Sequence, residues 1–229
     1  MKLASLFSGG KDSTYAIFKS KSMGHEISCL VTIFPRSEES HLLHHPNIEM
    51  TRLQARLVGV PQIMVKVDSD DIRVEVAELK KALESAKKQF GIEGVVHGGI
   101  RSVFQKKHFE KICSDLGLAV ISPLWNVDEA SYLRELVSSG FHFIMTSVTA
   151  EGLDGSWLGR EISLDDVEKL IAISSKSGFH PSFEGGEAET FVTECPLFSG
   201  TIKITKSLKS WDGYRGRFEI TEAVLEEQC

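Results

Sequence analysis

The segment Ser8-Gly9-Gly10-Lys11-Asp12-Ser13 constrains the fold of this chain more than any other stretch of its length. It follows the apolar run Leu3–Phe7, which predicts a buried strand, and precedes Tyr15–Phe18, which predicts a helix. Small residues at such a junction let a phosphate approach the backbone, where the helix presents its first N–H groups and its positive dipole end. A Walker A loop has a longer spacer before its Gly-Lys pair. The segment therefore predicts a different phosphate-binding loop, or more simply a Gly-rich turn with a capping residue.

The first half of the chain alternates apolar strand candidates with amphipathic helix candidates. The strands are predicted at Leu3–Phe7, Ser28–Phe34, Gln62–Val67, Gly94–His97 and Ala119–Ile121, and the helices at Ser13–Met23, Ile48–Leu57, Asp71–Phe90 and Ser102–Leu116. This alternation predicts an α/β domain with a parallel, doubly wound, five-stranded sheet. Ligands of such sheets bind beyond the carboxyl ends of the strands, where Ser8–Ser13 and His97–Ser102 are both expected.

Pro123 marks a change of character, and a smaller α+β domain is predicted to follow it. Its elements are a helix capped by Asp128, a strand at Phe141–Val148, a helix opened by a Ser163–Asp166 capping box, and strands from Thr190 onward joined by a turn at Trp211–Gly216. The expected domains are therefore 1–122 and 123–229. A single continuous domain is the alternative, because no flexible linker separates the halves.

Net charge, apolar stretches and cysteine spacing limit the classes of protein to which this chain can belong. The net charge of −6 over 229 residues argues against a large nucleic-acid footprint. The chain has no apolar stretch that could span a bilayer, and its N-terminus enters a strand at once, so neither membrane insertion nor a signal peptide is expected. The four cysteines are scattered without a C-x-x-C pair, which fits reduced thiols and a cytoplasmic location and provides no zinc site.

A second notable segment is Glu184-Gly185-Gly186-Glu187-Ala188-Glu189-Thr190. Three carboxylates around a glycine pair are suited to binding Mg²⁺ or a cationic substrate. A solvated acidic turn that leads into a strand is the equally weighted alternative. The loop His41–His45 contains three histidines, but a solvated loop is favoured over a metal site there.

Together these segments resemble the diphthine–ammonia ligases and related PP-loop (N-type) ATP pyrophosphatases, which have a HUP-like fold. The family's second domain carries an E-G-G-E-x-E-T-F signature, matched from Glu184 to Phe191, although an aromatic residue is usual at the position of Ala188. Other matching stretches are Glu38–Ser40, His44, Pro46–Ile48, Gln54-Ala55, Gln105, Ser122–Trp125, Ala150–Asp154 and Ser156–Arg160. The resemblance covers Leu3 to about Phe198.

The resemblance implies an ATP- and Mg²⁺-dependent ligase. It would adenylate the carboxylate of diphthine on elongation factor 2, release pyrophosphate and form the amide, diphthamide, with ammonia. The alternatives are a PP-loop enzyme acting on a small carboxylate or a tRNA base, and a non-catalytic ATP or AMP sensor. The sequence leaves the oligomeric state open, with a homodimer among the alternatives.

The resemblance also implies roles for particular residues. The expected nucleotide-binding residues are Ser8, Gly9, Gly10, Lys11, Asp12, Ser13, Gly98 and Gly99. The expected catalytic residues are Lys11, Asp12, Glu187 and Glu189, with Asp12 and Glu187 as Mg²⁺ ligands. The expected substrate-binding residues are Glu184, Gly185, Gly186, Glu187, Glu189 and Thr190, with Trp157 offering an aromatic face to the trimethylammonium group of diphthine.

Overall fold

The structure is a computed structural model that describes residues 1–34 and 47–227. Its contacts divide the chain into two compact units, here called the first and second unit. The first comprises Met1–Ser8 and Asp12–Trp125, and the second comprises Gly9–Lys11 and Asn126–Cys229. The predicted domain bounds, 1–122 and 123–229, stay a prediction. The contact division groups three residues of the early loop with the later part of the chain.

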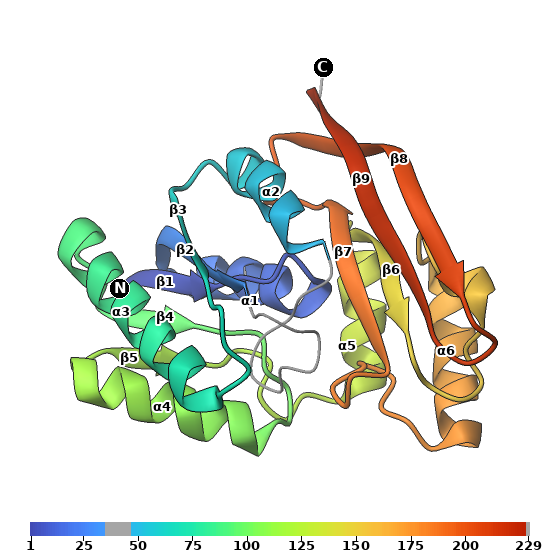
Figure 1. The fold of residues 1–229 in the computed structure, drawn as a ribbon, viewed down its shortest axis with the longest axis horizontal. Coiled ribbons are helices and arrows are strands. Elements are labelled where there is room, and N and C mark those ends of the chain that lie inside the picture. The colour runs from blue at the N-terminus through green and yellow to red at the C-terminus, as the bar shows by residue number, and fades with distance from the viewer. Residues whose placement is uncertain (35–46, 228–229) are drawn as a thin grey trace. The chain divides into compact units, whose positions relative to one another are not determined.

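The first unit contains a sheet with the strand order β3-β2-β1-β4-β5 (Figure 1). The strands are β1 Lys2–Leu6, β2 Glu26–Phe34, β3 Gln62–Lys66, β4 Gly94–Val96 and β5 Ala119–Ile121. Every neighbouring pair is parallel, which confirms the predicted α/β class and its five-stranded sheet. The interior strand β2 is buried along most of its length, as expected of a strand covered on both faces.

Helices cover both faces of this sheet (Figure 1). They are α1 Lys11–Ser22, α2 Thr51–Val58 after the short 3₁₀ turn η1 Ile48–Met50, α3 Ile72–Phe90 and α4 Val103–Leu116. Leu79 and Leu83 of α3 and Phe109 of α4 share one buried core with strand residues such as Val31 and Val95. Asp71 caps α3 by accepting a hydrogen bond from the Arg73 N–H, which confirms the predicted start of that helix.

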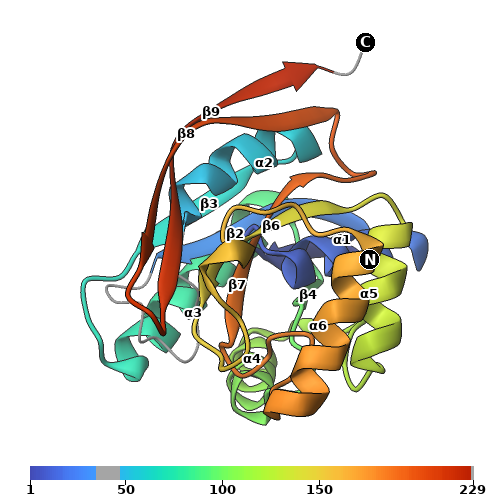
Figure 2. The same cartoon turned by 90° about the vertical axis from the view of Figure 1, so that its right-hand side faces the viewer.

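The second unit contains a sheet with the strand order β7-β6-β9-β8. Its strands are β6 His142–Val148, β7 Ala188–Glu194, β8 Gly200–Trp211 and β9 Gly216–Glu227, and its helices are α5 Glu129–Ser138, the 3₁₀ turn η2 Gly155–Trp157 and α6 Leu164–Ser177. Its strand pairs are antiparallel, and α5 and α6 lie side by side against the sheet (Figure 2). Ser163 and Asp166 form the predicted capping box of α6.

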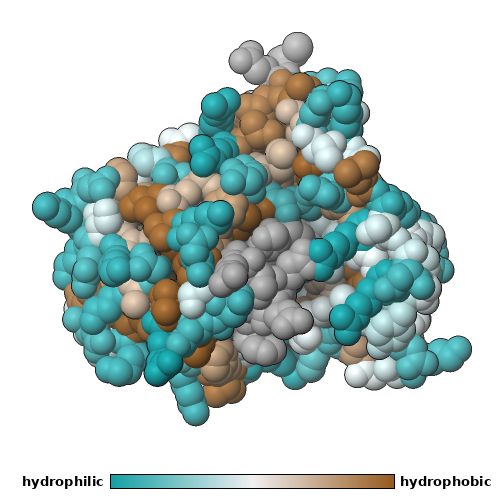
Figure 3. All heavy atoms as spheres, viewed as in Figure 1, coloured by the Kyte–Doolittle hydropathy of each residue, from teal (hydrophilic) through white to brown (hydrophobic). Residues whose placement is uncertain are grey.

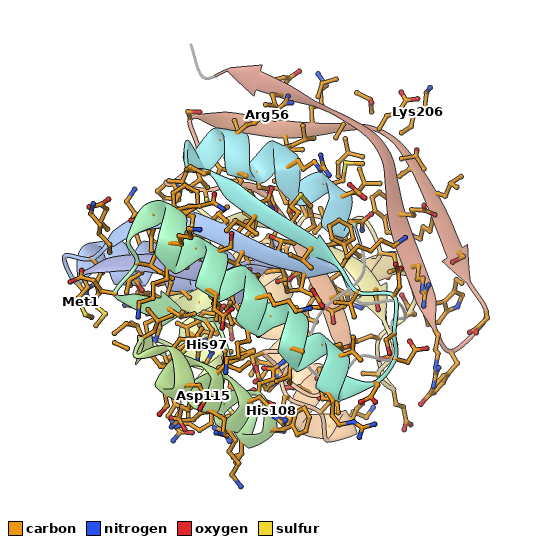
Figure 4. The ribbon with its side chains drawn as sticks, turned by 60° about the vertical axis from the view of Figure 1, so that its left-hand side comes forward. Met1, Arg56, His97, His108, Asp115 and Lys206 are labelled. Atoms are coloured by element: carbon orange, nitrogen blue, oxygen red, sulfur yellow. The ribbon has the colours of Figure 1, made fainter. Side chains whose placement is uncertain are left out.

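The long hairpin of β8 and β9 turns where the sequence predicts. Asp212 closes the turn by accepting hydrogen bonds from the N–H groups of Tyr214 and Arg215, at 2.8 and 2.7 Å. Cross-strand ion pairs line the exposed hairpin, including Lys206 with Glu222 at 2.6 Å (Figure 4). Apolar side chains such as Leu208 and Val224 are also exposed, and Figure 3 shows apolar surface in this part of the molecule. No helix of the described residues is long and apolar enough to cross a bilayer.

A close backbone contact joins the loop after β4 to the start of α1 within the first unit. A Cβ atom added at Gly98 would lie 2.5 Å from the Asp12 carbonyl carbon, 2.6 Å from its oxygen and 2.7 Å from the Ser13 nitrogen. These neighbours are backbone atoms and cannot turn away as a flexible side chain can. The absence of a side chain at Gly98 therefore allows the loop after β4 and the start of α1 to approach each other at the carboxyl edge of the sheet.

This contact predicts that Gly98→Ala destabilises the first unit. Forcing the β4 loop and α1 apart should cost about 1–3 kcal/mol, the usual range for overpacking. The measurement is the urea midpoint followed by far-UV circular dichroism. Gly99→Ala is the comparison variant and should cost less, because the atom nearest its added Cβ lies farther away, the Nδ1 of His97 at 3.0 Å. Equal midpoints for Gly98→Ala and the unaltered chain would contradict the prediction.

Candidate functional site

The loop between β1 and α1 is shaped by its glycine and serine residues. Gly9 has a φ of 78°, a left-handed conformation that favours glycine. The Ser13 hydroxyl accepts a hydrogen bond from the Ser8 N–H at 3.3 Å and lies 3.1 Å from the Ser8 hydroxyl. Helix α1 begins at Lys11, two residues before the predicted start, so Lys11 and Asp12 lie in its first turn. The loop thus presents hydroxyl groups and a helix N-terminus at the carboxyl end of β1.

Residues Gly9–Lys11 of this loop belong to the second unit, where strand β7 contacts them. The Val192 N–H donates to the Gly9 carbonyl oxygen at 3.0 Å, and the Lys11 N–H donates to Thr190 Oγ1 at 3.1 Å. Two predicted site residues from distant parts of the sequence, Lys11 and Thr190, are therefore in direct contact. The backbone N–H of Lys11, the first residue of α1, therefore donates to a threonine hydroxyl here.

The Lys11 side chain is buried, with only 1% of its surface exposed. Its ammonium group donates to the Ser182 carbonyl oxygen at 2.6 Å and lies 5.0 Å from the centre of the Phe183 ring. A cation in this position is oriented by the segment that precedes the Glu184–Thr190 turn. Ser182 and Phe183 were missed from the sequence, because no motif or periodicity links them to Lys11.

The Glu187 carboxylate closes its own turn. One oxygen accepts a hydrogen bond from the His180 N–H at 3.1 Å, and the other accepts one from the Gly185 N–H at 2.8 Å. The Glu187 carbonyl oxygen in turn accepts from the Thr149 N–H at 2.8 Å. Gly186 has a φ of 82°, which lets the chain reverse between these contacts. Both carboxylate oxygens of Glu187 therefore stabilise the turn itself.

The other predicted acidic residues occupy different places in this segment. Glu184 lies in the turn, and Glu189 lies in β7 opposite Ser147, both half-buried. The described residues contain no cluster of three or more histidine, cysteine or carboxylate side chains arranged to hold a metal ion. The assignment of Mg²⁺ to Asp12 and Glu187 stays a prediction. The histidines at positions 41, 44 and 45 lie outside the described residues.

A buried carboxylate in α5 supports the Ser182 segment. Glu129 is only 5% exposed, and its Oε2 accepts hydrogen bonds from the Ser182 hydroxyl at 2.8 Å and the Ser182 N–H at 3.3 Å. Its other oxygen lies 3.3 Å from His180 Nδ1. No sequence motif singles out Glu129. A carboxylate in the first turn of a helix, directly after the Asp128 cap, is ordinarily explained by the helix dipole.

Trp157 does not offer an open aromatic face. Its side chain is buried, with 6% of the residue exposed, and the Arg160 guanidinium lies 5.4 Å from the ring centre. Arg160 is itself tied to Asp166 of the α6 capping box. A ring already covered by a cation of its own chain is poorly suited to a substrate cation, so Trp157 has no place in the function proposed below.

Thr146 is a buried residue at an irregularity in the pairing of β6 with β7. Met145 pairs with Thr190 and Ser147 pairs with Glu189, which leaves Thr146 without a counterpart. Its hydroxyl has no hydrogen-bond partner among the described residues. Bulges of this kind are common beside functional sites. No sequence pattern signals the irregularity.

His97 organises the loop after β4. Its Nδ1 accepts a hydrogen bond from the Gly99 N–H at 3.1 Å, so its proton resides on Nε2, which donates to the Ser122 hydroxyl at 2.7 Å. The ring also packs against Phe109 of α4. Burial, and secondarily the charge of Lys106, lower the pKa of His97 to about 4. Packing against Asp12 explains why Gly98 is a glycine, while the assignment of Gly98 and Gly99 to nucleotide binding stays a prediction.

Comparisons with known proteins place the chain in a family. Residues 1–120 match the family model of the diphthamide synthase N-terminal domain, and residues 128–225 match that of the C-terminal domain. The chain belongs to the diphthamide synthase family. The matched N-terminal domain contains the Ser8–Ser13 loop, and the matched C-terminal domain contains the Glu184–Thr190 turn.

Curated relatives of this diphthamide synthase family member are named diphthine–ammonia ligase. The Danio rerio protein is 32% identical over 222 residues, which cover 89% of this chain and 86% of that protein. The human protein is 32% identical over 230 residues, covering 90% of this chain and 84% of that protein. The Schizosaccharomyces pombe protein is 30% identical, but the match covers only 36% of its length.

Solved structures were matched as well, among them a predicted subunit of tRNA methyltransferase from Methanocaldococcus jannaschii. It covers 85% of this chain and 97% of its own, with 18% sequence identity and a TM-score of 0.45. A likeness at that level carries no argument about function.

The burial of neutral His97 predicts that the chain loses stability in mild acid. Because its pKa is lowered from 6.5 to about 4 in the folded state, the unfolded chain binds the proton more readily between these values. The free energy of unfolding should fall by about 2 kcal/mol between pH 7 and pH 5 on account of this group. Urea unfolding at both pH values measures the effect.

Substitution isolates the contribution of His97. His97→Gln cannot take up the proton, so its loss of stability between the two pH values should be smaller by that amount. His108→Gln, on α4 of the same unit, should keep the acid sensitivity of the unaltered chain. If His97→Gln retained the full acid sensitivity, the assignment to His97 would be wrong.

Proposed function

We propose that this chain is a diphthine–ammonia ligase, an ATP-dependent enzyme that amidates the diphthine carboxylate of elongation factor 2. The observation that carries the proposal is the match of both halves of the chain to diphthamide synthase domains, with a phosphate-type loop at the first strand-to-helix junction. The names of the curated relatives supply the acceptor and the nitrogen source. In this proposal elongation factor 2, which carries the diphthine, is the protein substrate, and ammonia is the second substrate.

The loop at Ser8–Ser13 fits the phosphates of ATP. Its left-handed Gly9, its two serine hydroxyls and the N-terminus of α1 form a donor set suited to anions. Asp12 would hold Mg²⁺ together with phosphate oxygens, since Mg²⁺ in such sites takes few protein carboxylates. Glu187 is not included as a Mg²⁺ ligand in this proposal, because both of its carboxylate oxygens already accept backbone hydrogen bonds.

When bound, ATP supplies an adenylate that activates the substrate carboxylate and a pyrophosphate that leaves. The chain's own residues orient these groups and compensate their charge, which is the main way proteins assist such transfers. Lys11, held at the Ser182 carbonyl oxygen, and the helix dipole of α1 would compensate the developing pyrophosphate charge. Ammonia then displaces AMP at the activated carbonyl carbon, losing a proton as the amide forms.

The described cysteines support ammonia as the direct nitrogen donor. Burial raises the pKa of Cys29 and Cys195 to about 12 and that of Cys113 to about 11. These thiols carry little thiolate at neutral pH and are poor nucleophiles for releasing ammonia from glutamine. Their reduced state also agrees with the cytoplasmic location that forms part of the proposal.

The proposal predicts that AMP and pyrophosphate form when the chain is mixed with diphthine-bearing elongation factor 2, ATP, Mg²⁺ and ammonium. The accompanying change on elongation factor 2 is one amide in place of one carboxylate, which mass spectrometry detects. Elongation factor 2 lacking diphthine is the matched control and should yield no AMP above background. Equal AMP formation with both forms, or with a tRNA or small carboxylate in their place, would contradict the proposed substrate.

Asp12→Asn should reduce AMP formation by about 100-fold, the scale seen when an electrostatic group at a reacting centre is removed. Asparagine keeps the size of the side chain in the first turn of α1 but lacks the charge that would bind Mg²⁺. The measurement is initial rate at saturating ATP, with circular dichroism to check the fold. Asp115→Asn, an exposed carboxylate at the end of α4 paired with Lys80 and Lys111, is the control (Figure 4). Unchanged turnover in Asp12→Asn would limit Asp12 to a structural role.

A further inference from the structure

Two opposite charges are buried within the second unit, and one residue bridges them. Lys11 is 1% exposed and Glu129 is 5% exposed. The Lys11 ammonium donates to the Ser182 carbonyl oxygen at 2.6 Å, while the Ser182 hydroxyl donates to Glu129 Oε2 at 2.8 Å. The Ser182 N–H, at 3.3 Å, is a second contact to the same oxygen. Ser182 therefore connects the cation of the phosphate loop to the carboxylate of α5.

This bridge has a physical consequence for Lys11. A buried charge is tolerated only where fixed dipoles or an opposite charge compensate for lost hydration. The Ser182 carbonyl supplies a dipole, and its direction depends on the conformation of Ser182. The two hydrogen bonds from Ser182 to the carboxylate fix that conformation, because bonds to a charged acceptor are the strong ones. Glu129 thereby sets where the Lys11 ammonium is held.

The backbone of Lys11 is fixed by the same segment. Its N–H donates to Thr190 Oγ1, and the Gly9 carbonyl oxygen accepts from the Val192 N–H. Glu187 closes the turn between Ser182 and Thr190 through the N–H groups of His180 and Gly185. The backbone N–H and the side-chain ammonium of Lys11 therefore both contact one continuous stretch of chain, His180–Val192.

We propose that Glu129 and Ser182 are positioning residues for Lys11, acting on the binding of the terminal phosphates of ATP. The inference rests on the proposed function only in taking Lys11 as a ligand of those phosphates. The Glu184–Thr190 turn would then act on ATP indirectly, by holding Lys11 in place. In this role the turn positions the Lys11 ammonium, and the carboxylate of Glu187 maintains the turn.

The difference between ATP and AMP affinity tests this role. ATP carries the two terminal phosphates that Lys11 would contact, and AMP lacks them. Glu129→Gln and Ser182→Ala should weaken ATP binding about tenfold, the scale of one hydrogen bond to a charged group, and leave AMP binding unchanged. Lys11→Met should show the same selective loss. Isothermal titration of both nucleotides, with Mg²⁺ present for ATP, provides the measurement.

Three further variants and a stability measurement separate positioning from damage to the fold. Ser182→Thr keeps the hydroxyl and the carbonyl group and should restore ATP affinity to within about threefold of the unaltered chain. Glu129→Asp keeps the charge but shortens the side chain, and should give an intermediate ATP affinity. Glu168→Gln removes an exposed carboxylate of the same unit, paired with Arg134, and should change neither affinity. Thermal unfolding of each variant shows whether it remains folded.

The outcomes distinguish this inference from the proposed function. Parallel loss of ATP and AMP affinity in Glu129→Gln and Ser182→Ala would assign both residues to the fold and overturn the inference. Unchanged ATP affinity in both would overturn it as well, as would an unaltered chain that binds ATP no more tightly than AMP. If the selective loss is found but no AMP forms with diphthine-bearing elongation factor 2, the positioning role stands and the proposed substrate fails.

Discussion

The arrangement of the candidate site depends on burying one ammonium group. Lys11 sits in the first turn of α1, at the point where the chain passes from a β-strand into a helix, and its charge is out of contact with water. Such a charge requires compensation, and the Ser182 carbonyl is part of it. Three features fix that carbonyl. Glu129 of α5 is buried, its Oε2 accepts from both the hydroxyl and the N–H of Ser182, and Glu187 closes the turn that follows.

The carboxyl edge of the parallel sheet imposes a second constraint within the first unit. The loops after β1 and β4 must approach each other at backbone distance, which only a residue without a side chain allows at Gly98. His97, immediately before it, is held neutral by burial and by a donor on Nδ1, so that one ring fixes both Gly99 and Ser122. Rigid loops at this edge are what a phosphate-binding site needs, because preorganised donors do not have to reorient when charge arrives.

Local sequence patterns predicted the elements, since each rests on residues close together in the chain. The apolar stripe of α3, the capping box of α6 and the turn at Asp212 all follow from neighbouring residues, as does the order of strands and helices. The contact of Lys11 with Ser182 spans 171 positions and leaves no periodic trace. The same is true of the bond between Glu129 and Ser182, and of the bulge at Thr146. Sequence reasoning found the loop and the acidic turn, but not the residues that join them.

Residue type alone does not decide what a carboxylate does in a turn. Glu187 stands next to a glycine pair, and such a group can bind a cation or the N–H groups of its own backbone. Gly185 and Gly186 favour the second outcome, because Gly186 adopts a φ of 82° and a Cβ added at Gly185 would lie 2.7 Å from Glu187 Oε1. With that space, the chain folds back far enough for the Gly185 and His180 N–H groups to reach the two oxygens. The absence of side chains at Gly185 and Gly186 thus gives space to the Glu187 carboxylate. The closed turn that results holds Ser182 and Thr190 in contact with Lys11.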